Sequence, residues 1–149
     1  MSFLDQVKNS DARRQSEYFE EGSYLVEIKN FKLGQNRKNR EFCVVETSVI
    51  DSSNLERHPR NSERSWLQMT DMDVAARNIR GFLCQALNVP DSQLTDQMID
   101  RAFEPVKETG LSPLAGLKIG VNARTVERPN KSDYTVVDFY PVDQEQTQL

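Results

Sequence analysis

The sequence predicts a mainly β fold that is interrupted by a helical insert, an α+β class built as a single domain. Alternating apolar and polar residues, rich in β-branched and aromatic side chains, occur before residue 70 and again after residue 116. Between these regions the apolar residues recur at helical spacing. The 149 residues are enough for one core, and 37% hydrophobic with 28% charged residues is a globular composition and not a disordered one.

The first predicted strand spans residues 24–31, where Val26 and Ile28 alternate with charged residues as in a half-buried strand. A second strand, residues 41–50, is rich in β-branched and aromatic side chains. Residues 1–21 are polar and weakly patterned. We expect them to form an arm with room for one helical turn.

A short third strand is predicted at residues 65–69, after which the pattern changes to helical spacing. Thr70 and Asp73 have the spacing of a helix-capping box, and residues 74–86 show an apolar face. A second helix is predicted at residues 92–103. The sequence therefore predicts two helices in the middle of the chain.

Two further strands are predicted at residues 117–124 and 134–140. Three strands, then helices, then two strands is the element order of a five-stranded OB-type β-barrel with its helices between strands three and four. In that architecture the loops that follow strands one and four lie beside one binding face. Here these loops are residues 35–40 and 127–133, and both contain Arg and Lys.

We place the single domain at residues 22–142, between the arm and a short polar tail at residues 143–149. No apolar run approaches the length that crosses a bilayer, and residues 1–5 lack the pattern of a secretory signal. We therefore expect a cytoplasmic protein with no membrane partner. Exposed strand edges and the polar arm leave a homodimer open.

Residues 29–40 are the most unusual stretch of the chain, because they have five cationic side chains and no carboxylate in a protein of net charge −4. The flanking strands concentrate this charge at the tip of a hairpin. An anionic partner is the simplest explanation, and a nucleic-acid backbone is the commonest one. The alternative is a solvated hairpin tip.

Single-stranded nucleic acid is held by cations that follow its phosphates and by rings that stack on its bases. Strand alternation, with Val26 and Ile28 inward, predicts that Lys29 and Phe31 face outward. The same argument predicts an outward Trp66, for which packing under the helical insert is the alternative. The predicted nucleic-acid-binding residues are Lys29, Phe31, Lys32, Arg37, Lys38, Arg40, Trp66, Lys118, Arg124, Arg128, Lys131 and Tyr134.

Catalysis and metal binding have little support in the sequence. The single histidine, His58, is expected to be solvated in a loop, and no nucleophile elbow or phosphate-binding glycine loop occurs. Cys43 and Cys84 lie in apolar patterns typical of buried free thiols, and a disulfide between them is left open. We expect a protein that is not an enzyme, with no cofactor or metal. The Glu-x-Lys triplet at residues 27–29 leaves a metal-dependent nuclease as a less favoured alternative.

Over residues 19–142 the chain resembles phage-encoded single-stranded DNA-binding proteins of the OB-fold type, from replication and recombination modules. The resemblance rests on residues 19–26, 42–46, 51–53, 58–59, 65–66, 76–82 and 117–121.

The resemblance implies sequence-tolerant binding and protection of single-stranded DNA in phage replication or recombination, in the cytoplasm of the host. Replication or recombination proteins would be further partners. Several members of this class recruit such partners through a strongly acidic tail, which residues 143–149 match weakly. The alternative function is a protein-interaction module of a phage, structural or host-directed, with no nucleic-acid role.

Overall fold

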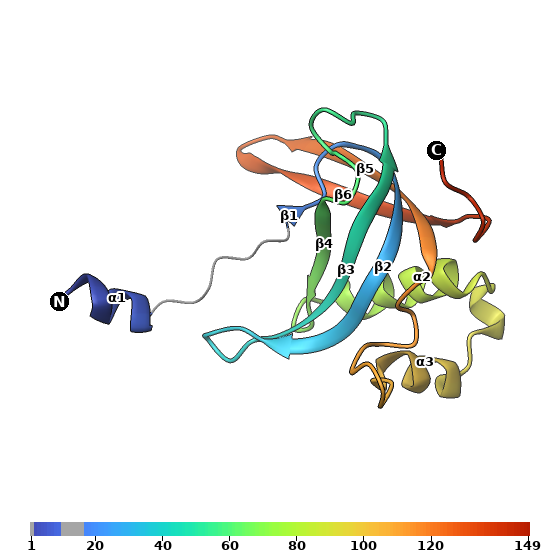
Figure 1. Ribbon diagram of the computed structural model, residues 1–149, viewed down its shortest axis with the longest axis horizontal. Coiled ribbons are helices and arrows are strands. Elements are labelled where there is room, and N and C mark those ends of the chain that lie inside the picture. Colours follow the sequence, from blue (N-terminus) through green and yellow to red (C-terminus); the bar gives the residue numbers. More distant parts are fainter. Residues whose placement is uncertain (1, 10–16) are drawn as a thin grey trace.

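A curled sheet of six strands forms the body of the protein, in the order β1-β4-β3-β2-β5-β6. The computed structural model describes residues 2–9 and 17–149. The helical insert lies against one end of the sheet, whereas the N-terminal helix lies apart from it (Figure 1).

The strands are β1 (Glu17–Tyr18), β2 (Gly22–Gln35), β3 (Glu41–Ser52), β4 (Glu63–Met69), β5 (Lys118–Arg128) and β6 (Lys131–Pro141). The helices are α1 (Phe3–Asn9), α2 (Ala75–Leu87), the short 3₁₀ helix η1 (Asp91–Gln93) and α3 (Asp96–Phe103). Central strand β2 pairs antiparallel with β3 and β5, β3 with β4, and β5 with β6. In contrast, β1 pairs in parallel with β4.

The mainly β class with a helical insert is confirmed, and the insert separates the third and fourth long strands. The strand count differs from the predicted five because β1 adds a sixth strand within the predicted arm. The arm also contains the seven-residue helix α1, where we expected one turn.

Phe31 faces the core, so the prediction of an outward ring is wrong. Ile28 lies opposite Thr47 and Asn30 opposite Glu46, which leaves Lys29 as an extra residue on β2. A bulge of one residue reverses the alternation that follows it. The Phe31 ring is 1% exposed as a result and packs in the aromatic cluster beneath the helical insert.

Trp66 is also buried, so its predicted outward orientation is wrong and the alternative, packing under the helical insert, is confirmed. Residues directly opposite on paired strands share a face of the sheet, and Trp66 lies opposite the fully buried Val45. Its ring centroid lies 5.8 Å from that of Phe82 on α2 and 4.9 Å from that of Phe139 on β6. The tryptophan thus links β4 to the edge strand β6 and to the helix.

The first helix of the insert begins later than predicted. α2 starts at Ala75 after Val74, which makes no side-chain capping bond, and the Thr70 hydroxyl donates to Glu41 on β3. The predicted capping box is therefore wrong. The second predicted helix is divided into η1 and α3, and Thr95 caps α3 by accepting from the backbone N–H of Met98. Neither these helices nor α1 is long and apolar enough to span a membrane.

Candidate nucleic-acid interface

A groove of about 650 Å³ lies between β4, α2 and β6. In the part of the chain that the structure describes, no ladder joins β4 to β6, so the curled sheet remains open along this seam. Trp66, Phe82 and Phe139 line the groove with aromatic side chains. Its other lining residues include Met69, Met72, Val74, Arg77, Tyr134, Val136 and Asp138.

Two basic hairpins extend toward the same side of the molecule, one from β2–β3 and one from β5–β6, with β1 between them (Figure 1). The Asn36 side chain shapes the first tip by accepting from the backbone N–H groups of Lys38 and Arg40. Asn39 and Asn130 adopt left-handed backbone conformations at the two tips. The sequence therefore places a turn-forming asparagine at each site where the chain reverses.

Tyr134 and Arg128 form a cation–π contact on the β5–β6 hairpin. The Arg128 guanidinium carbon lies 4.6 Å from the centroid of the Tyr134 ring, which is 44% exposed and lines the groove. The same guanidinium donates to the Ser132 carbonyl at 3.0 and 2.8 Å. These contacts hold a cation and an accessible ring together at the edge of the groove.

Four of the predicted phosphate-binding cations pair with carboxylates instead. The pairs are Lys29 with Glu27, Lys32 with Glu46 at 3.4 Å, Arg40 with Asp71 at 2.9 Å and Arg124 with Asp138 at 3.8 Å. In three of these pairs, those of Lys32, Arg40 and Arg124, the carboxylate comes from another segment of the chain. Residues 29–40 contain no carboxylate, but the fold brings carboxylates from other segments against them.

The Arg40–Asp71 pair is the best formed of the four. Nε and Nη2 of Arg40 each donate to one oxygen of Asp71 at 2.9 Å. These hydrogen bonds lower the pKa of the Asp71 carboxyl and raise that of the guanidinium. The pair ties the base of the β2–β3 hairpin to the segment that leads into α2.

Three predicted cations, Lys38, Arg128 and Lys131, form no ion pair within residues 2–9 and 17–149, and all three are exposed. Arg37 is exposed on the same tip as Lys38. Lys118 is half-buried. Its backbone N–H donates to Oε1 of Gln144 at 2.8 Å, and its carbonyl accepts from Nε2 of Gln144 at 3.1 Å. Among the predicted cations, the exposed ones without an ion pair in the described residues therefore lie on the two hairpins.

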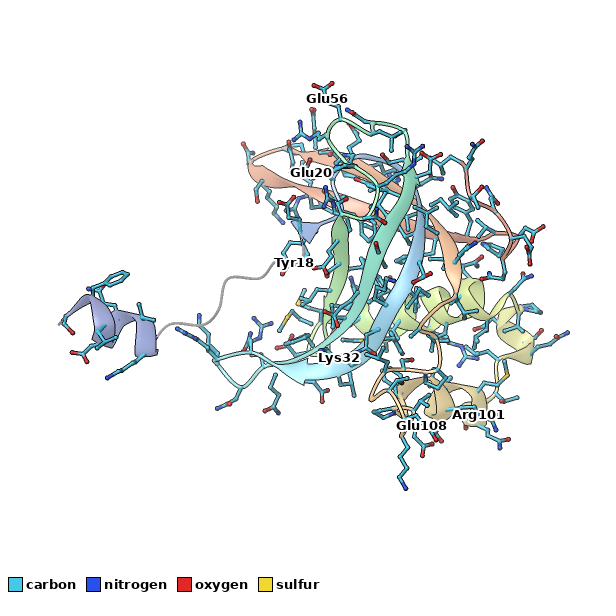
Figure 2. The ribbon with its side chains drawn as sticks, in the orientation of Figure 1. Tyr18, Glu20, Lys32, Glu56, Arg101 and Glu108 are labelled. Atoms are coloured by element: carbon cyan, nitrogen blue, oxygen red, sulfur yellow. The ribbon has the colours of Figure 1, made fainter. Side chains whose placement is uncertain are left out.

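The structure brings together only part of the predicted site. Lys29 and Lys32 line a separate hollow of about 470 Å³ on β2 and β3, with Glu46 and Glu63 on its walls (Figure 2 labels Lys32). Tyr134 lines the β4–β6 groove, Arg128 contacts its ring, and Lys131 lies on the same hairpin. Phe31 and the nearly buried Trp66 do not offer ring faces for stacking.

Sequence reasoning missed the apolar rim of the groove. Met72 and Val74 lie in the connection between β4 and α2 and are 56% and 50% exposed. The sequence predicts Val74 on the apolar face of a helix, which in the structure begins one residue later, at Ala75. Exposure depends on the fold, so the signal in the sequence was only the two apolar residues on either side of Asp73, just before the helix.

His58 is 1% exposed, so the prediction of a solvated histidine is wrong. Its Nδ1 lies 3.3 Å from Nη2 of the buried Arg64, which must be the donor, and its ring lies 5.0 Å from that of Tyr24. Burial, together with the charge of Arg64, lowers the pKa of His58. This cluster lies where β1 meets β4, because Glu17 pairs in register with Arg64.

The two cysteines are buried free thiols, and burial raises the pKa of the Cys43 thiol to about 12. Among residues 2–9 and 17–149, no three His, Cys, Asp or Glu side chains are grouped so that they could hold a metal ion. In the Glu-x-Lys triplet of β2, the Glu27 carboxylate pairs with Lys29.

Comparison with protein-family models produced no match to this chain, and comparison with curated proteins produced none either.

Proposed function

We propose that this protein binds single-stranded DNA without strong sequence preference and protects it during phage replication or recombination. The β4–β6 groove would receive the bases, and the tips of the two basic hairpins would contact the phosphates. The protein would do this as a binding protein and not as an enzyme.

The arrangement of strands supports an OB-type barrel as the scaffold. The first long strand, β2, is central, with β3 and β4 on one side and β5 and β6 on the other. The helical insert follows the third long strand, and the seam between β4 and β6 would be where the barrel remains partly open. This arrangement accounts for a groove beside the loops that follow the first and fourth long strands.

Tyr134 at the edge of the groove is the observation that carries the proposal. An exposed ring with a guanidinium against it combines base stacking with phosphate attraction in one element. Lys131 lies on the same hairpin, and Arg37 and Lys38 lie on the other hairpin on that side of the molecule (Figure 1). A strand that followed these cations would cross the apolar rim of the groove.

Fluorescence anisotropy of a labelled oligonucleotide tests the proposal. Tyr134→Ala should weaken binding by about 5- to 150-fold, since one stacked base contributes roughly 1–3 kcal/mol. Lys38→Glu combined with Lys131→Glu should weaken binding further and flatten its salt dependence. A duplex of the same sequence should bind less tightly than the single strand.

The matched control reverses two cations of α3 and of the segment that follows it, Arg101→Glu with Lys107→Glu. Arg101 lies on α3, away from both hairpins (Figure 2). The control changes net charge by the same amount, so general repulsion of DNA would weaken both double variants equally. Equal weakening, or no binding by the wild-type protein at low salt, would overturn the proposal.

The exposed apolar residues of α1 favour a second candidate function, a phage protein-interaction module. In that case the wild-type protein would not bind oligonucleotide, and reversal of Lys38 and Lys131 would leave its protein partner bound. The less favoured nuclease alternative requires divalent-metal-dependent cleavage that disappears in Glu27→Gln.

A further inference from the structure

Helix α1 presents an apolar face that its own chain leaves open to solvent. Phe3, Leu4 and Val7 are 79%, 60% and 54% exposed, and their spacing places them on one side of the helix. A helix of seven residues is too short to be stable alone in water, and its stability in a protein comes from packing of such a face. The helix therefore has the character of a docking segment.

The β4–β6 groove is the concave counterpart of this face. Met72 and Val74 form its exposed apolar rim, and Met69 and Val136 are half-buried along its walls. Methionine side chains are flexible and adapt to aromatic and aliphatic partners, as the Phe3 and Leu4 side chains would require. Helix-in-groove docking of this kind places two or three apolar anchors into one cleft.

We propose that α1 of a second copy of this chain docks in the β4–β6 groove. The direction of β1 favours a second copy over the helix of the same chain. Glu17 pairs with Arg64 and Tyr18 with Ser65, in parallel, so β1 begins beside the Glu63 end of β4. The groove is lined by Trp66–Met69 and by the segment that follows, toward the other end of β4.

The charges of the helix and of the groove are complementary. α1 has Asp5 in its first turn and Lys8 in its last, whereas the groove has Arg77 on the α2 wall and Asp138 on the β6 wall. Asp138 already pairs with Arg124 at 3.8 Å, so attraction between Asp5 and Arg77 would set the direction of the docked helix. Because each copy has both surfaces, reciprocal exchange closes a twofold dimer.

The proposed dimer would form in the absence of nucleic acid, although it uses the groove that we propose for DNA. If both proposals hold, α1 and a DNA strand compete for one site, and oligonucleotide should dissociate the dimer. The test of the dimer is therefore made in the absence of nucleic acid, so that its failure does not depend on the proposed function.

Sedimentation velocity of the full-length protein over a range of concentrations tests this contact. The wild-type protein should show a concentration-dependent dimer. Two double variants, Phe3→Ser with Leu4→Ser and Met72→Glu with Val74→Glu, should each raise the dimer dissociation constant at least about tenfold, since each removes apolar surface that the contact would bury. All four positions are exposed, so both variants should fold, as circular dichroism would verify.

The control removes two exposed leucines outside both surfaces, Leu33→Ser with Leu55→Ser, and should leave the dimer intact. A mixture of the helix variant and the groove variant retains one intact helix and one intact groove, so it should form heterodimers that neither variant forms alone. A wild-type protein that is monomeric throughout, or a dimer that persists in both variants, overturns the proposal. A monomer whose Trp66 emission shifts on replacement of Phe3 and Leu4 would place α1 in its own groove and would also overturn it.

Discussion

His58 shows at the residue scale how a buried side chain outside the candidate site can set the pH dependence of stability. The folded protein keeps the ring neutral, because it is buried and its Nδ1 accepts from Arg64. Its pKa is lowered in the folded state, whereas the unfolded chain has the ordinary value of about 6.5. The unfolded state therefore binds the proton first as the pH falls.

We expect His58 to contribute its full stabilisation above about pH 6.5 and to lose it as the pH falls through the lowered pKa of the folded state. Over that range the free energy of unfolding should fall by at most about 1.4 kcal/mol per pH unit. Urea unfolding at a series of pH values would measure it. His58→Gln should remove the histidine component of the slope between pH 7 and 5. An unchanged slope in this variant would show that His58 titrates normally.

The residues of the candidate site were predictable only in part. Clustering of cations along residues 29–40 identified the hairpin tip, and Lys38 is exposed there. The sequence could not show that Asp71 and Glu46 approach from neighbouring segments and neutralise Arg40 and Lys32. Such pairing depends on which strands lie side by side, and local sequence does not encode it.

Strand β2 shows at the element scale why alternation can identify a strand and still misplace its side chains. On β5, which pairs regularly with β2, Ile119, Val121 and Ala123 are buried as the period of two predicts. On β2 the bulge at Lys29 shifts the period, so Phe31 turns inward. No residue type in the sequence marks the bulge. The two residues of β1 are too few to show any period.

Phe31→Ala should lower the free energy of unfolding by about 3–5 kcal/mol, because it leaves a cavity between β2 and the helical insert. Leu33→Ala, two residues along the same strand at an exposed position, should change it by less than about 0.5 kcal/mol. Urea denaturation of both variants provides the comparison. Similar values for the two would indicate that the bulge is absent and that Phe31 lies on the surface.

At the scale of the whole molecule, an acidic protein with paired cations over much of its surface can bind DNA only where positive charge remains available. The net charge is −4, and three of the predicted cations, Lys38, Arg128 and Lys131, lie on the two hairpins and form no ion pair in the described residues. We therefore expect binding to be confined to the side of the molecule toward which both hairpins extend (Figure 1). Few phosphates would be neutralised, so the salt dependence should be moderate.

Trp66 offers the most direct test, because it is the only tryptophan in the chain and it lines the proposed DNA groove. Titration with a single-stranded oligonucleotide at low salt should change the Trp66 emission. The emission change should saturate at the same oligonucleotide concentration as the anisotropy of the labelled oligonucleotide. Lys38→Glu with Lys131→Glu should shift both curves to higher concentration together. Oligonucleotide binding that leaves Trp66 emission unaltered, or the absence of binding at low salt, would contradict the account.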